Sequence, residues 1–174
     1  MRYKKIKGAD FVKVTMHNAP LDTNSEPPVV GESFPEFSLE NDRQQRVTLQ
    51  GLNGKYVLIS VVPNINTRVC SLSTKKFNER VDNFPNIDFL TISTNTADEQ
   101  KNWCAAENVS EMQLLSDAQG SFGKQLGLYI SDKGIDARSV WIIDHAGKIV
   151  YRELIGEQSN EPDYAAALTF LEQH

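Results

Sequence analysis

Two cysteines, Cys70 and Cys104, are the residues of this chain with the most distinctive chemistry. Cys70 follows a polar loop that starts at Pro63, and it lies where a helix is predicted to begin. Unpaired N–H groups and the positive end of the helix dipole favour an anion at such a position, which biases the thiol toward a thiolate. A thiolate is a nucleophile that can be oxidised, so the pattern points to thiol redox chemistry.

The number and spacing of the cysteines limit which thiol chemistry is possible. Two cysteines are too few for a disulfide scaffold or a four-thiolate zinc site, and they form no Cys-x-x-Cys motif. One cysteine must therefore act in each step, and in a reducing compartment a disulfide between them would be transient and catalytic. The histidines, His17, His145 and His174, are scattered and support neither a metal site nor a Cys-His pair.

Each candidate residue taken alone has an ordinary structural explanation. A lone cysteine in a helix is most often an inert buried side chain, and Cys104, beside Trp103 and two alanines, could likewise be a plain core residue. Arg138 at a strand edge is ordinarily a surface charge, and Thr67 is an ordinary helix-entry residue. The case for a catalytic site rests on their combination.

The elements around Cys70 are predicted from hydrophobic patterning. Residues 56–62 form an apolar, β-branched run that is typical of a central strand covered on both faces. Pro63 ends this strand, because proline has no N–H for the sheet ladder. Apolar spacing predicts a helix over 69–84, and residues 87–93 form a second buried strand. This order indicates a βαβ unit with parallel strands.

The remaining elements are predicted from shorter patterns. A capping box at Thr96 and Glu99 predicts a helix through Glu107 that carries Cys104. Strand patterns occur at residues 3–7, 11–16, 34–39, 47–49, 114–117, 139–143 and 148–154, and helical patterns at 121–126 and from about 160–162 onward. Polar residues predict surface connections over 17–31 and 130–137.

The order of these elements predicts the fold class. A βαβ unit, a further helix and a ββα unit make up the α/β layout called thioredoxin-like, with a mixed central sheet and helices on both faces. We expect a single domain over residues 1–174, because 174 residues that are 40% hydrophobic suit one core. The N-terminal β-hairpin, residues 1–16, is expected to be an appendage to it.

Charge and composition exclude some partners. The net charge of −5, with acids and bases interspersed, argues against nucleic acid, which requires a basic patch. The basic N-terminus is not followed by an apolar run, so no signal peptide and no membrane helix is predicted. We therefore expect a cytoplasmic protein without a membrane partner.

Four segments together resemble a known family over nearly the whole chain. They are Pro63-x-x-x-Thr67-x-x-Cys70 with Lys75-Lys76-Phe77-Asn78 after it, Asn102-Trp103-Cys104-Ala105-Ala106-Glu107, Ala137-Arg138-Ser139-Val140, and Asn160-Glu161-Pro162-Asp163-Tyr164. These segments resemble the thiol peroxidase (Tpx) branch of the peroxiredoxin family, of the atypical 2-Cys type. The spacing of 34 residues between the cysteines (104 minus 70) also matches that branch.

The resemblance implies a role for each candidate residue. Cys70 would be the peroxidatic cysteine, which attacks the peroxide and becomes a sulfenic acid, and Cys104 the resolving cysteine, which condenses with it. Arg138 would favour the thiolate and stabilise charge on the departing oxygen. Thr67 would hold the peroxide in line, and Pro63 would cover the pocket and limit water access.

The resemblance also implies partners. Hydrogen peroxide and alkyl hydroperoxides would be the substrates, thioredoxin the reductant, and the protein a homodimer without a cofactor or metal. Two alternatives remain open at this point: a thioredoxin-fold redox sensor or chaperone module without efficient turnover, and a glutathione-peroxidase-like enzyme. The intact Pro63, Thr67 and Arg138 argue against the first.

Two further expectations concern the vicinity of the cysteines. Arg68, Asn66 and Val62 depart from the family pattern, and we expect Arg68 to favour the thiolate of Cys70 or to attract acidic hydroperoxides. Both cysteines are predicted to lie in helices, whereas a disulfide requires Cα atoms within roughly 7 Å. If the reduced protein holds them farther apart, both helix segments must unwind locally in each cycle, and Trp103 would report this rearrangement.

Overall fold

The computed structural model describes residues 4–5, 12–52, 56–109 and 112–174. Its largest element is a seven-stranded sheet with the strand order β12-β11-β6-β7-β8-β4-β5. The strands of this sheet are β4 (Ser38–Asn41), β5 (Arg46–Thr48), β6 (Tyr56–Val61), β7 (Ile87–Ser93), β8 (Gln113–Ser116), β11 (Ser139–Asp144) and β12 (Ile149–Leu154). The helices are α1 (Arg68–Asn78), η1 (Val81–Asn83), α2 (Ala97–Glu107), α3 (Ser121–Leu126) and α4 (Tyr164–Gln173).

The βαβ unit lies at the centre of the sheet, as predicted. β6 pairs with β7 in parallel, and β7 pairs with β8 in parallel. β11 pairs antiparallel with both β6 and β12, so the sheet is mixed. The β6 side chains from Leu58 to Val61 are buried because both faces of this strand are covered.

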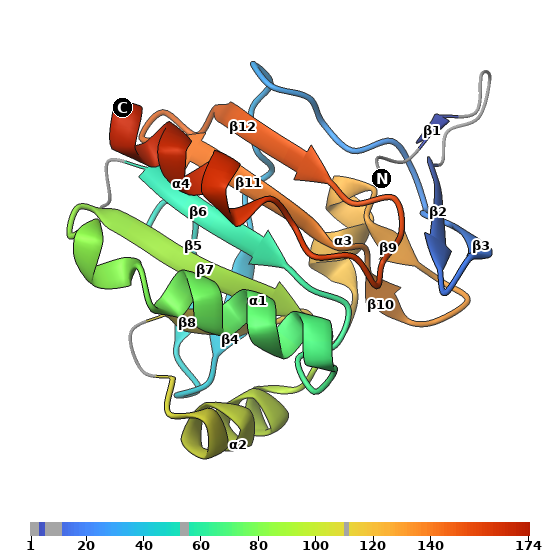
Figure 1. Ribbon diagram of the computed structural model, residues 1–174, viewed down its shortest axis with the longest axis horizontal. Coiled ribbons are helices and arrows are strands. Elements are labelled where there is room, and N and C mark those ends of the chain that lie inside the picture. Colours follow the sequence, from blue (N-terminus) through green and yellow to red (C-terminus); the bar gives the residue numbers. More distant parts are fainter. Residues whose placement is uncertain (1–3, 6–11, 53–55, 110–111) are drawn as a thin grey trace.

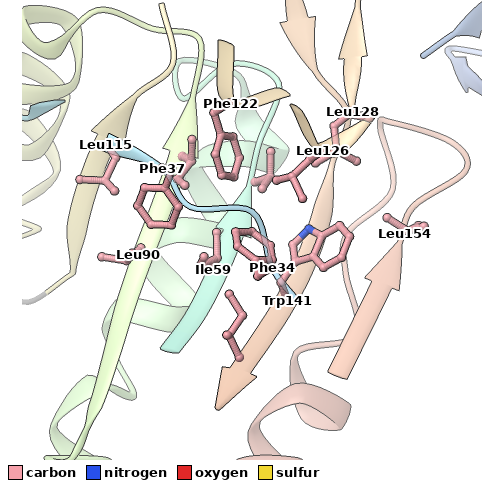
Figure 2. Packing of buried hydrophobic residues seen from close by; sticks show 14 of the residues in the cluster. Phe34, Phe37, Ile59, Leu90, Leu115, Phe122, Leu126, Leu128, Trp141 and Leu154 are labelled. Atoms are coloured by element: carbon pink, nitrogen blue, oxygen red, sulfur yellow. The ribbon is translucent and has the colours of Figure 1, made fainter. Parts of the chain in front are cut away.

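Helices cover both faces of the sheet (Figure 1). On one face α1, α2 and α4 pack over a core that includes Phe77, Trp103, Leu171 and both cysteines. On the other face α3 and the segment before β4 enclose a second core, in which Phe34, Phe37, Phe122 and Trp141 meet edge to face or tilted (Figure 2). The thioredoxin-like fold class is thereby confirmed.

The N-terminal segment forms a three-stranded sheet in place of a hairpin. β1 (Lys4–Lys5) pairs antiparallel with β2 (Val12–Met16), as predicted, and β2 also pairs with β3 (Ala19–Asp22). The expectation of a surface connection over residues 17–31 was wrong for β3, because His17 and Asn18 adopt positive φ and turn the chain back. The parts of the expected hairpin at 1–3 and 6–11 lie outside the described residues.

Two other predicted elements differ from the structure. The helix predicted over 69–84 ends at Asn78 and is followed by a single 3₁₀ turn, so the later apolar residues pack from a loop. The polar stretch 130–137 contains most of a short antiparallel ladder, β9 (Tyr129–Ile130) with β10 (Ile135–Asp136). Its two-residue strands are too short to produce an alternating pattern. Within the described ranges, no helix is long and apolar enough to cross a bilayer.

Candidate active site

Cys70 lies in the first turn of α1, as the sequence predicts. The helix begins at Arg68, and Thr67 is its N-cap residue. The Cys70 side chain is fully buried, and its carbonyl accepts a hydrogen bond from Thr74 Oγ1 at 2.9 Å. β6 ends at Val61, and the buried Pro63 turns the chain out of the sheet toward this helix.

Arg138 provides the cation beside the thiol. It lies immediately before β11, is only 3% exposed, and its Nη2 donates to Cys70 Sγ at 3.1 Å. Its Nε donates to the carbonyl of Gln158 at 2.9 Å, while Nη1 is buried without a hydrogen-bond partner among the described residues. A fixed cation at this distance favours the thiolate, and the free Nη1 donor suits an incoming oxygen.

The loop before Cys70 is held by its neighbours. Thr67 Oγ1 donates to the carbonyl of Asn64 at 2.9 Å, which leaves the lone pairs of the hydroxyl as acceptors. The N–H of Ile65 donates to Asn95 Oδ1 at 2.8 Å, and Asn95 Nδ2 donates to Asn64 Oδ1 at 3.1 Å and to Glu99 Oε2 at 3.0 Å. Asn95 therefore connects this loop to the first turn of α2, whose capping box of Thr96 and Glu99 is confirmed.

A pocket of about 390 Å³ opens beside these residues. Its wall includes three of the predicted site residues, Pro63, Thr67 and Arg138, together with Arg68. The wall also includes Met16 at the end of β2 and His17 after it, Ile135, and the segment that contains Gln158 and Ser159. The pocket thus collects residues from four separate parts of the chain above a buried thiol.

Cys104 lies in α2 as predicted, within the same core as Cys70. Both cysteines are buried free thiols. Burial, with a smaller contribution from Asp42, raises the pKa of Cys104 to about 11, although Arg43 opposes the shift. At neutral pH the Cys104 thiol is therefore protonated and a poor nucleophile for as long as α2 stays folded.

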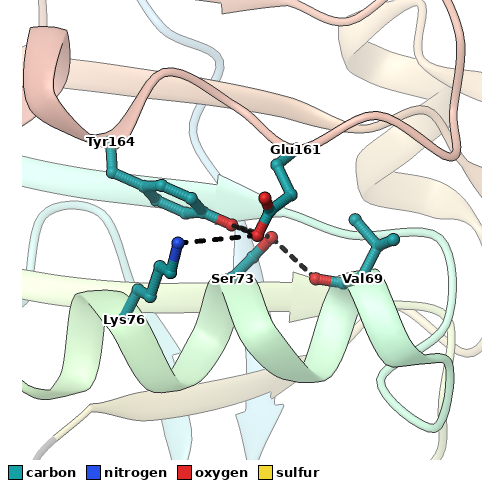
Figure 3. A network of polar contacts seen from close by, with 5 residues as sticks. All are labelled: Val69, Ser73, Lys76, Glu161 and Tyr164. Atoms are coloured by element: carbon teal, nitrogen blue, oxygen red, sulfur yellow. Dashed lines mark hydrogen bonds and ion pairs between the residues drawn. The ribbon is translucent and has the colours of Figure 1, made fainter.

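A polar network fastens α1 to the start of α4 (Figure 3). Tyr164 OH lies 3.0 Å from Ser73 Oγ, one turn beyond Cys70, and donates to Glu161 Oε1 at 3.1 Å. Lys76 Nζ lies 3.7 Å from the same carboxylate oxygen and 4.6 Å from the centre of the Tyr164 ring. Burial raises the pKa of Tyr164 to about 12, so the phenol keeps its proton.

Asp136, two residues before Arg138, is a buried acid. Burial raises the pKa of Asp136 well above its ordinary value, and the neighbouring carboxylate of Asp117 raises it further. Asp117 itself accepts hydrogen bonds from the N–H groups of Phe122 and Gly123, both at 2.9 Å, at the start of α3. Within the described ranges, no three histidine, cysteine or acidic side chains gather closely enough to hold a metal ion.

Sequence patterns indicate only part of this site. Cys70, Thr67, Pro63 and Arg138 come together, whereas Cys104 belongs to the neighbouring helix. Gln158 and the N-terminal sheet were missed, because a polar stretch after β12 and a short alternating strand contain no pattern that indicates contact with Arg138. The family resemblance includes the nearby segment from Asn160 to Tyr164 but implies no role for it.

Comparisons with known protein families and sequences agree with this geometry. The model of the AhpC/TSA family matches residues 30–152. A protein named thiol peroxidase from Listeria monocytogenes serotype 4b is 41% identical over 159 residues, which is 91% of this chain and 96% of that protein. The thiol peroxidase of Bacillus subtilis is 33% identical over 155 residues, 88% of this chain and 93% of the relative.

Solved structures show the same arrangement of elements. A peroxiredoxin-like protein from Aquifex aeolicus has a TM-score of 0.87 at 28% identity, covering 95% of this chain and 99% of that one. A thiol peroxidase from Chromobacterium violaceum has a TM-score of 0.84 at 18% identity, covering 92% and 96%. The second likeness shows the fold alone.

Proposed function

This chain belongs to the AhpC/TSA family and is a thiol-dependent peroxidase, and we propose that it works by an atypical two-cysteine mechanism. The observation that carries the proposal is the 3.1 Å contact from Arg138 Nη2 to Cys70 Sγ at the wall of a pocket. A thiolate held by a fixed cation, next to a second unpaired donor, has what it requires to attack a polarised O–O bond.

In the first step the Cys70 thiolate attacks one oxygen of a hydroperoxide. The O–O bond breaks, the sulfur gains that oxygen and is oxidised by two electrons, and the other oxygen leaves and takes up a proton as water or an alcohol. Arg138 Nη1, which has no hydrogen-bond partner in the part of the chain that the structure describes, is available to the departing oxygen. Thr67 Oγ1 donates its proton to Asn64, so it can accept the hydrogen bond of the hydroperoxide O–H.

In the second step Cys104 attacks the Cys70 sulfenic acid. The S–S bond forms, the sulfenic hydroxyl leaves as water with the Cys104 proton, and the protein holds an intramolecular disulfide. We infer that α1 and α2 loosen before this thiol reacts, because Cys104 is buried in the folded core and burial raises its pKa to about 11. Thioredoxin then reduces this disulfide by exchange, which restores both thiols and converts the dithiol of thioredoxin to a disulfide.

The substrate and the setting follow from the same mechanism. Hydrogen peroxide and alkyl hydroperoxides both fit, because the wall of the pocket includes the apolar side chains of Met16, Ile135 and Val69 beside the polar Thr67 and Arg138. We place the enzyme in the cytoplasm, as one domain over 1–174 and as a homodimer, with no cofactor. The exposed surface near the Cys70 loop is the first place to look for the dimer contact.

A coupled assay tests this function. Purified protein with thioredoxin, thioredoxin reductase and NADPH should consume hydroperoxide, and Cys70→Ser should abolish consumption. Cys104→Ser should still react once with peroxide and then stop. Intact mass after one equivalent of peroxide should show the loss of two hydrogens, mapped by peptide analysis to Cys70 and Cys104. A reduced mass that stays unchanged, or a disulfide to another molecule, would contradict the mechanism.

A further inference from the structure

The segment between β12 and α4 connects the N-terminal sheet to Arg138. Gln158, at its centre, is only 2% exposed and uses all of its polar groups. Its Oε1 accepts from the Arg138 backbone N–H, its carbonyl accepts from Arg138 Nε at 2.9 Å, and its Nε2 donates to the Ile155 carbonyl at 2.6 Å. Its N–H donates to the Thr15 carbonyl of β2 at 2.7 Å.

These bonds determine how the guanidinium can point. A guanidinium has five donors in one plane, so a bond at Nε and a fixed backbone N–H leave little freedom of rotation. With Nε held by Gln158, Nη2 reaches Cys70 Sγ and Nη1 stays free for an oxygen. The same residue thus anchors the backbone and the side chain of Arg138.

β2 is fixed to the same segment from the other side. The Thr15 N–H donates to the Gly156 carbonyl at 2.8 Å, Thr15 Oγ1 donates to Glu157 Oε1 at 3.1 Å, and the Asn18 N–H donates to the same oxygen at 2.7 Å. Although burial opposes ionisation, these bonds and those from Ser159 lower the pKa of Glu157 to about 2. Glu157 is therefore a fixed anion that clamps β2 at neutral pH.

The position of β2 matters because its end reaches the pocket. Met16 and His17, directly after Thr15, form part of the wall that faces Thr67 and Arg138. A series of hydrogen bonds therefore links the pocket wall at Met16 and His17, through Thr15 and Gln158, to the Arg138 guanidinium beside the thiol. A purely structural attachment would explain the Glu157 clamp, but it does not require the Gln158 amide to bond the N–H of Arg138.

We propose that Gln158 is a positioning residue that holds the Arg138 guanidinium on Cys70, and that the docking of β2 through Thr15 and Glu157 maintains this position. The inference rests on the proposed role of Arg138 in the peroxidase reaction. It makes the N-terminal sheet a working part of the active site, although this sheet contributes no reacting atom.

The test uses the full chain with Cys104→Ser, so that Cys70 is the only thiol that peroxide or iodoacetamide can modify. Gln158→Met keeps the length of the side chain and removes the two bonds of its amide, to the Arg138 N–H and to the Ile155 carbonyl, whereas the backbone carbonyl that accepts from Arg138 Nε remains. We expect the second-order rate of Cys70 oxidation by hydrogen peroxide to fall about five-fold, the factor that one net hydrogen bond contributes. The pH midpoint of Cys70 alkylation by iodoacetamide should rise in parallel. Glu157→Gln, which weakens the clamp on β2, should shift both quantities in the same direction by less.

A matched control separates positioning from stability. Gln100 is another buried glutamine whose amide makes two hydrogen bonds, to Ser93 and Leu115, and neither involves Arg138, so Gln100→Met should lower the melting temperature and leave both Cys70 readouts unchanged.

The outcomes distinguish the possible failures. Gln158→Met with a normal rate and midpoint would overturn the inference, as would equal shifts in the Gln100 control. If the protein with wild-type Gln158 fails to react with peroxide, the proposed function fails instead.

Discussion

Replacement of Tyr164 by phenylalanine should accelerate disulfide formation. Tyr164 OH lies 3.0 Å from Ser73 Oγ, and Ser73 is one turn beyond Cys70 on α1. If the first turns of α1 must unwind for Cys70 to meet Cys104, this contact opposes the unwinding and slows the second step. Tyr164→Phe keeps the ring that packs on Phe77 and removes only the hydroxyl.

The magnitude follows from a count of protons in this network. Ser73 and Tyr164 have one hydroxyl proton each, whereas three contacts compete for them: Ser73 with Val69, Ser73 with Tyr164, and Tyr164 with Glu161. The contact with Glu161 is exposed and adds little to stability. Tyr164→Phe leaves the bond from Ser73 to Val69 in place, and loss of the part-buried bond between Tyr164 and Ser73 costs about 1 kcal/mol. The unwinding equilibrium, and with it the rate of disulfide formation, should therefore increase about five-fold.

Stopped-flow fluorescence measures this effect. After one equivalent of hydrogen peroxide, Trp103 beside Cys104 should report disulfide formation as the second phase, and rapid alkylation followed by mass spectrometry should give the same rate. The first phase, oxidation of Cys70, should be unchanged. Tyr129→Phe, on the distant β9, is the control. The variant should also form less sulfinic acid at high peroxide, because its sulfenic acid has a shorter lifetime.

Two results would refute this reasoning. An unchanged second phase in Tyr164→Phe would mean that the Tyr164–Ser73 contact does not limit unwinding. A slower first phase would show that Tyr164 acts through Arg138 instead, whose charge lowers the pKa of Tyr164 as a minor opposing effect.

Three other changes test separate parts of the structure. The rate of disulfide formation should rise with pH and level off above a pH of about 8.5, the pKa of an exposed thiol, because Cys104 reacts after unwinding. A rate that still rises past about pH 10 would indicate attack from the folded helix, where the pKa of Cys104 is about 11. Arg68→Gly should reduce the rate with acidic hydroperoxides by about two- to five-fold, because the exposed Arg68 lines the pocket; identical kinetics and alkylation profile would remove its role. Asp136→Asn should stabilise the protein more at pH 8 than at pH 5 in urea unfolding, because the raised pKa of the buried carboxyl makes its ionisation costly in the folded state. The cost begins above the unfolded pKa of 3.8 and grows until pH reaches the folded pKa, so the difference between the two pH values is about 1.4 kcal/mol for each unit by which the folded pKa exceeds 5. An equal gain at both pH values would contradict this.

Local sequence patterns predicted the elements whose boundaries are determined by neighbouring residues in the sequence. The capping box of Thr96 and Glu99, the apolar run of β6 and the break at Pro63 each specify a boundary through contacts within a few residues. The helix with Cys70 began where expected for the same reason. Its end at Asn78 was missed, because the apolar spacing continues into the 3₁₀ turn and no glycine or proline interrupts it.

Long-range contacts could not be predicted in this way. The bonds of Gln158 join residues 20 positions apart, at Arg138, and 143 positions apart (158 minus 15), at Thr15. No periodicity in a polar stretch of this kind specifies its partners. The position of Arg138 itself was anticipated only from the family resemblance, since a strand-edge arginine is ordinarily a surface charge.

The two cysteines have opposite environments in the reduced protein, and this difference orders the reaction. Cys70 is buried, yet Arg138 Nη2 lies 3.1 Å from its sulfur, so the folded helix favours attack on peroxide. Cys104 is also buried, and burial raises its pKa to about 11, which disfavours its thiolate in the same state. In the proposed mechanism, the second step therefore follows when the helices loosen. The contact between Tyr164 and Ser73 on α1, and the Asn95 bridge to α2, hold the protein in the form that reacts with peroxide. Breaking the Asn95 bridge with Asn95→Ala should likewise accelerate the second step, but it should also disturb the loop of Thr67 and slow the first step, which Tyr164→Phe should not.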